Sequence, residues 1–491
     1  MFKDDENMNT YTLTVNIINF IFLLNIIFAI VVIVCERRNA QSTWTWLMIM
    51  LFIPFLGFIL YLFFGQDLRR KKFFVLKKEE ESKILQMSHQ QKKLLTNSSI
   101  ISENSSIGEY ADVMSLNLSS DNFIVTSNNQ VDILNNGEEK FPEMISAIKN
   151  AKKFIHMEYY IFQDDNLGKT ILELLIEKAK EGVEVKLLYD GMGCINIKRN
   201  FFSPLKAAGG EVFCFFPPFV PYINVRINYR NHRKICIVDG YHGFIGGLNI
   251  GDEYLGLDKK FGFWRDIHLH LQGDSVSSLE IRFLLDWRFA SKDDFPMDEK
   301  YFPPKEFVGN TTVQIISSGP DSDWCSIRNT YLKLINKAKK SIYIETPYFI
   351  PDESILTALK IACLSGVAVK IIIPCKPDHP FIYWASKSYI WELVECGAKC
   401  YTYNDGFIHS KILSIDGKMC TIGTANMDIR SFSLNFEVNA VIYEVETTLA
   451  LDKAFEADIL NSTLLTVEDY KNRPFIIRFK ESISRLLSPI L

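Results

Sequence analysis

Two short stretches of the chain carry a histidine, a lysine and an aspartate at one shared spacing. They read HRKICIVD and HSKILSID, and both fit the pattern H-x-K-x4-D. An imidazole can attack phosphorus or carry a proton, and a lysine ammonium can neutralise phosphate oxygens. One such stretch is a weak signal, but two indicate a site for phosphodiester chemistry that is divided between them. We group these six residues as the catalytic set: His232, Lys234, Asp239, His409, Lys411 and Asp416.

The agreement between the two stretches continues beyond the motif. Gly246 and Gly423 lie at the same distance past their histidines, and so, a little further on, do Asn249 and Asn426. We expect the amides of the two asparagines to bind the nonbridging oxygens of a phosphate group beside the lysines. Because the lysines neutralise the charge, this chemistry needs no metal ion and no cofactor.

The spacing also predicts which side chains point together. On a strand, residues i and i+2 face the same side, so the histidine and lysine of each motif project together. The aspartate lies five residues past the lysine and faces the other side, which suits a structural anchor better than a proton carrier. A two-fold arrangement of the halves would bring both His–Lys pairs into one cleft. One histidine can then attack phosphorus while the other protonates the leaving alkoxide, two roles that require different protonation states.

A nucleophilic imidazole usually has a partner on its second ring nitrogen. Two acidic residues occupy corresponding places on the strand after each asparagine. Asp266, in FWRDIHLHLQG, follows the first motif, and Glu437, in LNFEVN, follows the second. The sequence therefore predicts that each carboxylate orients the histidine of its own copy.

The elements that must position these residues are written twice. From about residue 121 the chain alternates β-branched runs with amphipathic stretches, which indicates an α/β fold. The same order of helix end, strand, helix, strand, helix and strand occurs in both halves, so we expect two duplicated α/β lobes, 121–300 and 301–491. The matching segments are 150–162 with 337–349, 182–190 with 366–374 and 209–216 with 396–403.

The N-terminal region is apolar enough to enter a membrane. Residues 13–35 and 44–64 carry no charge, and each stretch is long enough to cross a hydrocarbon core of about 30 Å. We expect a two-helix transmembrane hairpin over 1–72, with Asn16, Asn19 and Asn25 hydrogen-bonded either to the second span or to another copy of the chain. A cytoplasmic linker over 73–120 should contain a short helix and then a flexible segment.

Charge and cysteine usage point to the cytoplasm. The loop between the two spans holds two arginines, whereas six basic residues follow the second span, so the positive-inside rule places the catalytic part in the cytoplasm. The ten cysteines include no C-x-x-C pair, which favours a reducing compartment. The net charge of −4 argues against a nucleic-acid partner. The six basic residues are Arg69, Arg70, Lys71, Lys72, Lys77 and Lys78.

These residues are similar to those of a known family. The paired H-x-K-x4-D motifs resemble the phospholipase D superfamily, and nearly the whole chain resembles its bacterial cardiolipin synthases. The stretches that carry the resemblance include NYRNHRKICIVDG, FWRDIHLHLQG, ETPYFIPD, GFIHSKILSIDG and LNFEVN. The resemblance implies two fused phospholipase D-like α/β lobes related by a pseudo-two-fold axis, with the active site at their seam.

The resemblance also implies phosphatidyl transfer at the cell membrane. One phosphatidylglycerol would donate its phosphatidyl group to a histidine and release glycerol, and a second would accept the group to give cardiolipin. Family precedent makes His232 the nucleophile and His409 the acid and then the base; the spacing does not rank them. The partners are then phosphatidylglycerol and other membrane phospholipids, and the oligomeric state is left open. The alternatives are a hydrolase, a synthase that uses phosphatidylethanolamine, a nuclease and a non-enzymatic lipid-binding scaffold.

Overall fold

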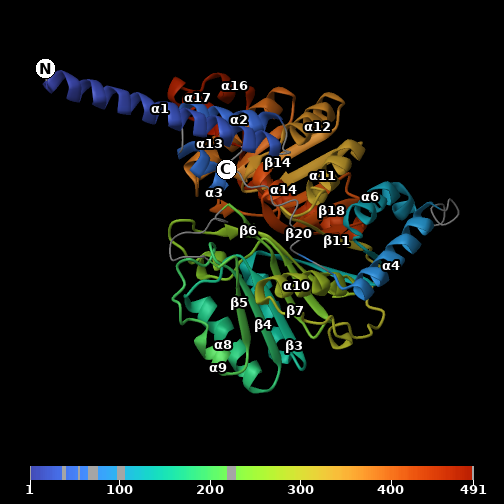
Figure 1. Ribbon diagram of the computed structural model, residues 1–491. Coiled ribbons are helices and arrows are strands. Elements are labelled where there is room, and N and C mark those ends of the chain that lie inside the picture. Colours follow the sequence, from blue (N-terminus) through green and yellow to red (C-terminus); the bar gives the residue numbers. More distant parts are fainter. Residues whose placement is uncertain are drawn as a thin grey trace. The chain divides into compact units, whose positions relative to one another are not determined.

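The computed structural model, shown in Figure 1, describes residues 2–35, 40–53, 56–64, 74, 76–96, 105–217 and 228–488. The chain divides into two compact units. The first unit comprises Met1–Lys71 with Pro218–Tyr229, and the second comprises Lys72–Pro217 with Arg230–Leu491. Apart from Pro218–Tyr229, both predicted lobes fall in the second unit, so both H-x-K-x4-D motifs belong to one body.

The described part of the first unit contains three apolar helices. Helix α1 (Phe2–Cys35) includes a stretch of 24 residues, Tyr11–Val34, with a mean hydropathy of 3.0. The second apolar stretch forms two shorter helices, α2 (Ala40–Phe52) and α3 (Leu56–Phe64). Among the described residues, α1 alone is long and apolar enough to cross a membrane. A second complete span is therefore not established by the helices.

Contacts within this unit hold the apolar helices together. The Asn25 side-chain amide donates a hydrogen bond of 2.9 Å to the carbonyl of Met50, which confirms the predicted role of this asparagine. The rings of Phe28 and Phe58 stack with their centroids 3.7 Å apart. Four of the six basic residues predicted to set the orientation, Arg69 to Lys72, lie outside the described residues.

The segment predicted as a flexible linker is largely helical. Helix α4 (Lys78–Thr96) packs against α6 (Ser105–Asp121), and α6 packs against the second lobe. Tyr110, Val113 and Met114 of α6 are buried in the core of that lobe. The prediction of a flexible link is wrong for α6, because its apolar residues recur at helical spacing and have a core to enter.

The first lobe is built on a sheet of seven strands. Strands β3, β4 and β5 run parallel, and β7 joins the other side of β3 in the antiparallel sense. Parallel strands need crossover helices, and the chain supplies them between β3 and β4 and between β4 and β5. In order across the sheet, the strands are β2 (Asn129–Asn135), β10 (Ile267–Gly273), β8 (His242–Gly246), β7 (Lys234–Val238), β3 (Phe154–Tyr159), β4 (Glu184–Asp190) and β5 (Glu211–Phe215).

The second lobe repeats this order with additions at both edges. Strand β1 lies inside the range predicted for the first lobe, 121–300, yet pairs with β11 of the second lobe, so the start of that range does not belong to the first sheet. The strand order confirms the duplication. It reads β1 (Val125–Thr126), β11 (Val313–Ser318), β20 (Asn435–Ile442), β18 (Met419–Gly423), β17 (Ile412–Ile415), β12 (Ser341–Glu345), β14 (Ala368–Pro374), β15 (Lys399–Tyr403) and β21 (Ser462–Leu464).

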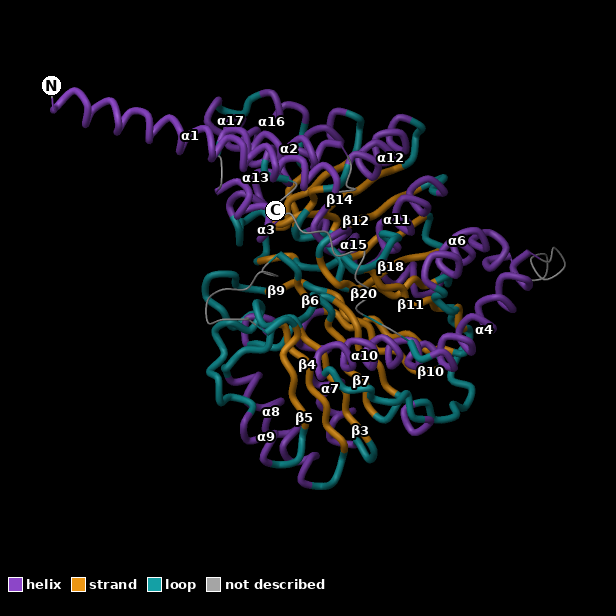
Figure 2. The backbone as a smooth tube through the Cα atoms, in the orientation of Figure 1, coloured by secondary structure: helices purple, strands orange, loops and turns teal. Residues whose placement is uncertain are grey.

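Helices cover the outer face of each sheet, as the purple and orange tubes of Figure 2 show. In each lobe, the second of the outer helices begins at an aspartate cap. Asp165 accepts from the Gly168 amide at the start of α8, and Asp352 accepts from the Ile355 amide at the start of α12. The outer helices are α7 (Asn136–Asn150), α8 (Asn166–Lys180) and α9 (Ser203–Ala207) in the first lobe, and α11 (Ser326–Lys337), α12 (Glu353–Leu364) and α13 (Pro380–Glu395) in the second.

The inner faces of the two sheets share one hydrophobic core. Helix α10 (Ser275–Ser291) packs on the first sheet and on β11, and α15 (Val445–Leu460) packs on the second sheet and on β2. Strands β8 and β10 contact β18 and β20 directly. The cluster between them includes Ile245 and Trp287 from one lobe and Ile422 and Phe455 from the other. This core fixes the lobes against each other and therefore fixes the seam at which the motifs meet.

The two motif aspartates end their strands in the same tight turn. Asp239 and Gly240 have φ values of +53° and +74°, and Asp416 and Gly417 have +56° and +67°. In each turn the amide two residues past the aspartate bonds back to the residue before it, so each hairpin closes with a type I′ turn. Asparagine and aspartate tolerate this left-handed region better than most residues.

The aspartate carboxylates are anchors. Asp239 accepts hydrogen bonds of 2.7–2.9 Å from the backbone amides of residues 152–154, at the start of β3. Asp416 accepts equivalent bonds from residues 339–341, at the start of β12. Strands of four to five residues span roughly 13–17 Å, and β7 and β17 separate the aspartates from the histidines of their motifs. Grouping Asp239 and Asp416 with the catalytic residues is therefore wrong, whereas their anchoring role is confirmed.

We expect Asp239→Ala to lower the free energy of unfolding by about 2–4 kcal/mol, since it removes three hydrogen bonds and places alanine at positive φ. Asp239→Asn is the matched control, because asparagine tolerates the turn and keeps one acceptor oxygen, so it should cost less. Thermal denaturation in detergent measures the loss, and kcat/KM of the remaining folded protein should stay within about threefold of wild type. A fully folded but inactive Asp239→Ala protein would contradict the anchoring role.

Candidate active site

His232 is held at the seam by pairing with the other lobe. The short strand β6 (Arg230–Asn231) pairs in parallel with the start of β20, and the His232 amide donates to the Phe436 carbonyl at 2.9 Å. The Asn231 amide also donates to the Asp190 carboxylate at 2.8 Å. The backbone before His232 is therefore fixed from both lobes.

His409 is held by the same arrangement in reverse. Strand β16 (Phe407–Ile408) pairs in parallel with β9 (Trp264–Arg265) of the first lobe, and the His409 amide donates to the Arg265 carbonyl at 2.7 Å. His232 therefore lies beside Phe436, the residue before Glu437, and His409 lies beside Arg265, the residue before Asp266.

This pairing crosses the two orienting carboxylates. The Nδ1 atom of His232 lies 3.0 Å from both carboxylate oxygens of Glu437, and the Nδ1 atom of His409 lies 2.7 Å from Oδ2 of Asp266. The prediction that each carboxylate orients the histidine of its own copy is wrong. Asp266 and Glu437 do contact the motif histidines, but each contacts the histidine of the other copy because the two-residue strands carry the histidines across the seam.

The contacts of Glu437 assign the tautomer of His232. An ionised carboxylate only accepts hydrogen bonds, so Nδ1 of His232 must carry the proton, and its Nε2 lone pair is left for a substrate. Two further donors hold the carboxylate: the Thr424 hydroxyl bonds to Oε2 at 2.5 Å, and the Asn435 amide bonds to Oε1 at 3.2 Å. A neutral imidazole with an exposed Nε2 lone pair is a nucleophile.

The second histidine has a lysine as an additional neighbour. Lys411 Nζ lies 2.8 Å from Nδ1 of His409 and also donates to the His409 carbonyl. Because Asp266 can only accept, Nδ1 of His409 carries the proton, and Lys411 must use the carbonyl as its acceptor. In the first motif Lys234 donates to the His232 carbonyl in the same way, at 2.6 Å. Each lysine thus steadies the backbone of its own histidine.

Both imidazoles are neutral at physiological pH in the free protein. Burial lowers the pKa of His232 to about 4, against the opposing charge of Glu437. Burial, with the nearby charge of Lys411, lowers the pKa of His409 to about 3. Burial acts to raise the pKa of Glu437, but His232 and Lys234 hold it below its usual value. A bound phosphate anion would favour the protonated imidazole, whereas both imidazoles are uncharged in the free protein.

The lysines of the two motifs act on each other. Burial lowers the pKa of Lys234 well below its usual value, and the charge of Lys411 contributes to that shift. Burial lowers the pKa of Lys411 to about 8, although Asp266 and Glu437 oppose it. Two ammonium groups forced together in a buried site gain stability from an anion between them, which is the expected property of a phosphate-binding site.

We expect kcat/KM to fall as the pH rises through the pKa of Lys411, near 8. The sign follows from its charge: below that pH the ammonium binds the phosphate, and above it the neutral amine does not. A pH–rate profile of kcat/KM measures this fall. In Lys411→Arg the guanidinium stays charged at that pH, so its profile should lose the alkaline fall even if the maximum is lower. An unchanged profile in Lys411→Arg would exclude Lys411 as the group that titrates.

The two asparagines differ in their surroundings. The side-chain oxygen of Asn249 accepts from the Ile161 amide at 3.1 Å, and its nitrogen donates to the Tyr254 hydroxyl at 3.0 Å. The side-chain oxygen of Asn426 is buried without a partner among the described residues. Asn249 therefore also braces the loop after β3, and a phosphate-binding role for both asparagines stays a prediction.

Several residues at the site were not predicted from the sequence. The ring of Tyr160 meets the His232 ring edge-on at 4.9 Å, and the Trp264 ring lies 5.1 Å from that of His409. Thr424, which supports Glu437, occupies the place that Gly247 has in the first lobe. A Cβ at Gly247 would lie only 2.1 Å from the Asp266 carboxylate, so this glycine makes room for it. The sequence does show this difference between the copies, as Gly247 in the first and Thr424 in the second.

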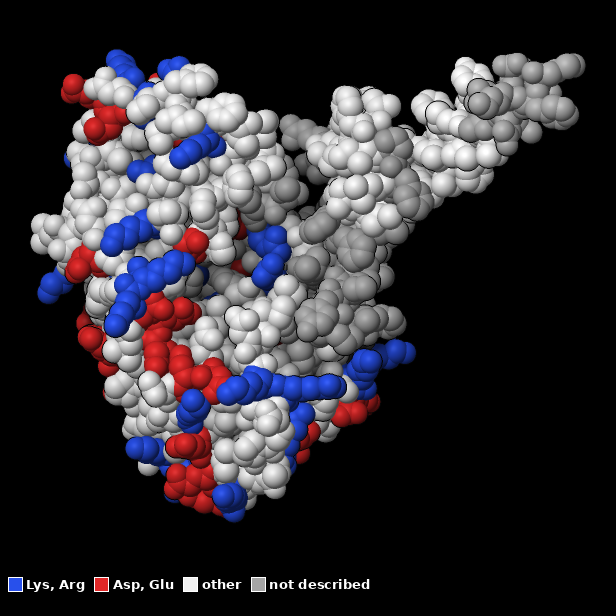
Figure 3. All heavy atoms as spheres, turned by 90° about the vertical axis from the view of Figure 1, so that its left-hand side faces the viewer, with Lys and Arg blue, Asp and Glu red and all other residues white. Residues whose placement is uncertain are grey.

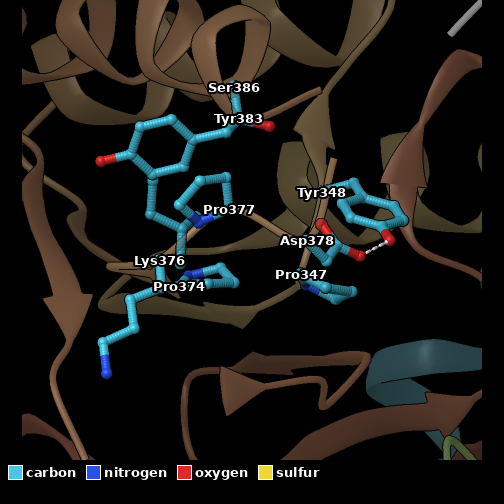
Figure 4. A pocket seen from close by; sticks show the side chains of 9 residues that line it. Pro347, Tyr348, Pro374, Lys376, Pro377, Asp378, Tyr383 and Ser386 are labelled. Atoms are coloured by element: carbon cyan, nitrogen blue, oxygen red, sulfur yellow. Dashed lines mark hydrogen bonds between the residues drawn. The ribbon is translucent and has the colours of Figure 1, made fainter. Parts of the chain in front are cut away.

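A small pocket lies in the second lobe (Figure 4). Tyr348 and Asp378 point toward each other across its wall, and the Tyr348 hydroxyl donates to the Asp378 carboxylate. The negative charge of Asp378 is among those that act to raise the pKa of Lys411, against the lowering caused by burial. On the face of the molecule shown in Figure 3, acidic and basic side chains lie interspersed.

Comparison with known proteins identifies the family. The model of the "Cardiolipin synthase, PLD-like domain" family matches residues 144–262 and 331–459, one copy on each lobe. The "Major cardiolipin synthase ClsA" of Bacillus subtilis (strain 168) is 48% identical over 97% of this chain and 99% of its own length. The chain belongs to the cardiolipin synthase family. The "Cardiolipin synthase" of Listeria monocytogenes serotype 4a is also 48% identical, over 96% of this chain and 98% of its own.

Two further matches cover the N-terminal region and the fold. The "Phospholipase_D-nuclease N-terminal" family model matches residues 23–66, the apolar region before the lobes of this cardiolipin synthase family member. Among solved structures, the phosphatidylserine synthase of Haemophilus influenzae Rd KW20 superimposes with a TM-score of 0.60 over 77% of this chain and all of its own. At 16% identity that likeness shows the shared fold alone.

Proposed function

We propose that the protein is a cardiolipin synthase that joins two phosphatidylglycerol molecules through a phosphohistidine intermediate. The observation that carries the proposal is the contact of His232 Nδ1 with both oxygens of Glu437, because it leaves Nε2 as a lone pair in a buried site with two lysines. The family membership of the chain supports the choice of substrates.

In the first step, Nε2 of His232 attacks the phosphorus of one phosphatidylglycerol. The N–P bond forms as the bond from phosphorus to the glycerol oxygen breaks. Lys234 and Lys411 neutralise the nonbridging oxygens, and the Asn426 amide donates a hydrogen bond to them. His409 gives its Nε2 proton to the glycerol leaving group. The phosphodiester anion supplies the charge that raises the pKa of His409 on binding, so this proton is taken up with the substrate.

In the second step the roles reverse. His409, now neutral, removes the proton from the free glycerol hydroxyl of a second phosphatidylglycerol, whose oxygen attacks phosphorus as the N–P bond to His232 breaks. The product is cardiolipin, and the net reaction releases one glycerol. Water has to be excluded from the phosphohistidine, since otherwise phosphatidic acid forms instead.

The membrane part of the proposal concerns the anchor. A two-span hairpin over residues 1–72, with the lobes in the cytoplasm, would hold the enzyme where both substrates lie. The apolar stretch Tyr11–Val34, its hydrogen bond from Asn25 to α2, and the family match over residues 23–66 support this arrangement. Accessibility of cysteines introduced among residues 36–39 and at Lys77, probed in sealed vesicles, would place the two sides of the membrane.

Purified protein supplied with phosphatidylglycerol labelled in its headgroup glycerol tests the activity. We expect cardiolipin and free labelled glycerol in equal amounts. Phosphatidic acid with no cardiolipin would show a hydrolase, and a requirement for phosphatidylethanolamine would show the other synthase reaction; either result would overturn the proposal.

A further inference from the structure

A cardiolipin synthase has to hold two phosphodiesters at once, and the histidine–lysine site accounts for only one of them. The acceptor phosphatidylglycerol brings a phosphate of its own, one glycerol away from the hydroxyl that attacks. This inference rests on the proposed function. A second anion site should therefore lie near His232, at about the span of a short linker from the reacting phosphorus.

A guanidinium lies at such a place. Arg230 Nη1 donates a hydrogen bond of 2.9 Å to the Tyr160 hydroxyl, and the Tyr160 ring lies 4.9 Å from the His232 ring. One tyrosine side chain thus separates the guanidinium from the imidazole. The Nε atom of Arg230 is buried and has no partner among the described residues. A buried, unpaired N–H is costly unless a ligand can accept from it.

A second arginine flanks the same position. Arg430 lies on α14 (Ile429–Ser433), which leads directly into β20, and Asn435 at the start of β20 is the register partner of Arg230. Burial lowers the pKa of Arg430 to about 10, and the charge of Arg230 adds to this effect. The carboxylate of Asp428 opposes the shift and is itself used as the helix cap, accepting from the Ser431 amide at 2.6 Å. Two like charges held near each other favour a bound anion.

Neither arginine has a counterpart at the corresponding place in the other lobe. Arg230 lies two residues before its histidine, where the second lobe has Phe407. Arg430 lies four residues after its asparagine, where the first lobe has Glu253. The histidines, lysines and asparagines are the same in both copies, but the arginines are not. An asymmetric pair suits a reaction whose donor and acceptor play different parts.

We propose that Arg230 and Arg430, with the Tyr160 hydroxyl, bind the phosphodiester of the acceptor phosphatidylglycerol. The guanidinium groups donate to its nonbridging oxygens, which places the free glycerol hydroxyl of that lipid at the phosphohistidine. The ligand class is a second anionic phospholipid, and neutral alcohols that reach the phosphohistidine do not need the arginines.

The test measures acceptor choice rather than total activity. Labelled phosphatidylglycerol is the donor in mixed micelles, with unlabelled phosphatidylglycerol and 1,3-propanediol as competing acceptors. In Arg230→Gln and Arg430→Gln we expect the ratio of cardiolipin to phosphatidylpropanediol to fall roughly 10- to 100-fold, the loss typical of one charge-assisted hydrogen bond. Transfer to the diol should stay within about threefold of wild type. The product ratio of Arg230→Lys should lie between those of wild type and Arg230→Gln, because lysine keeps the charge without the paired donors.

Arg199→Gln, at an exposed position of the first lobe, is the matched control and should leave the ratio unchanged. A parallel fall of both products in Arg230→Gln, or an unchanged ratio in both variants, would overturn the second phosphate site. If wild-type protein makes no cardiolipin, the proposed function itself fails, which is a different result from a failure of the arginines.

An independent observation concerns helix α17 (Phe475–Leu486), whose buried and exposed faces are the reverse of the usual arrangement. Its buried residues are polar. Glu481 accepts from the Trp391 indole at 3.0 Å, and Ser488, just past the helix, accepts from the Tyr389 hydroxyl at 3.2 Å. Both partners lie on α13, and Arg485 of α17 pairs with Glu392 of α13, so the helix docks on the second lobe through hydrogen bonds and an ion pair.

The apolar residues of α17 face outward. Phe475 is 74% exposed and Leu486 is 76% exposed, and Ile476, Phe479 and Ile483 share the same face. Contiguous exposed apolar surface of this kind marks an interaction site. Arg478 and Lys480 are exposed on the two flanks of that face. Apolar side chains bordered by cations are the pattern of a helix that lies in the headgroup region of an anionic bilayer.

We infer that the exposed face of α17 docks on the surface of the lipid bilayer. The chain carries an apolar stretch of membrane-spanning length, and the proposed substrates are anionic lipids, so a bilayer is the surface available to it. A docked helix would hold the second lobe at the surface from which both lipids are taken.

Full-length protein in phosphatidylglycerol vesicles tests the docking. Phe479→Trp should be quenched by phospholipids brominated on their acyl chains, after the signal of wild-type protein is subtracted. Glu173→Trp, on the exposed side of α8, is the matched control and should not be quenched. No added quenching in Phe479→Trp would show that protein covers this face, either the N-terminal helices or a second copy, and would overturn the inference.

Discussion

Replacing His232 with asparagine is expected to abolish cardiolipin formation, with a loss of more than about 10⁴ in kcat, because in the proposed mechanism this imidazole is the attacking group and carries the covalent intermediate. Asparagine has no comparable nucleophile, yet its side chain is close in size to the first atoms of the ring and can still bond to Glu437. The fold and the paired strands β6 and β20 should therefore persist, so the loss reports chemistry.

His409→Asn is the matched comparison. It should also lose cardiolipin formation, but its His232 remains able to attack, so a substrate with a good leaving group such as p-nitrophenol should still load the enzyme. Mass spectrometry of the intact protein would then detect a phosphatidyl adduct in His409→Asn and none in His232→Asn. An adduct on His232→Asn would exchange the roles of the two histidines.

Neutralising the crossed carboxylates gives the second large expected effect. Glu437→Gln should lower kcat by roughly 10²–10⁴, since an amide does not fix the His232 tautomer or stabilise the imidazole as it becomes charged. Asp266→Asn should cause a comparable loss through His409. The two losses should differ in kind, because Glu437 contacts His232, the proposed nucleophile, and Asp266 contacts His409, the proposed acid.

The leaving group separates the two carboxylates. Asp266→Asn should recover much of its activity with a p-nitrophenyl phosphodiester, which needs no proton on leaving, whereas Glu437→Gln should stay impaired with the same substrate. The ratio of initial rates with the two substrates is the measurement. Recovery in Glu437→Gln and none in Asp266→Asn would mean that each carboxylate serves the histidine of its own copy, contrary to the contacts at 3.0 Å and 2.7 Å.

Local patterns were enough to predict the strands, the duplication and the functional pairs. Each motif is a short apolar strand that ends at an Asp-Gly turn, and both properties lie within a single short run of consecutive residues. The linker was less readable. The apolar residues of α6 are buried only because the second lobe offers them a core, and a short polar-looking stretch does not show that core.

The sequence by itself determined the candidate residues for the chemistry: two histidines, two lysines and two carboxylates, each at a repeated place in a duplicated frame. The tertiary structure alone decided how they combine. The pairs β6–β20 and β16–β9 cross the seam, so Glu437 serves His232 and Asp266 serves His409. Spacing along a chain measures distance within a copy, whereas this exchange arises from hydrogen bonds between strands that lie far apart in the sequence, one in each copy. The repeat pattern alone does not show whether a strand pairs within its own copy or with the other copy.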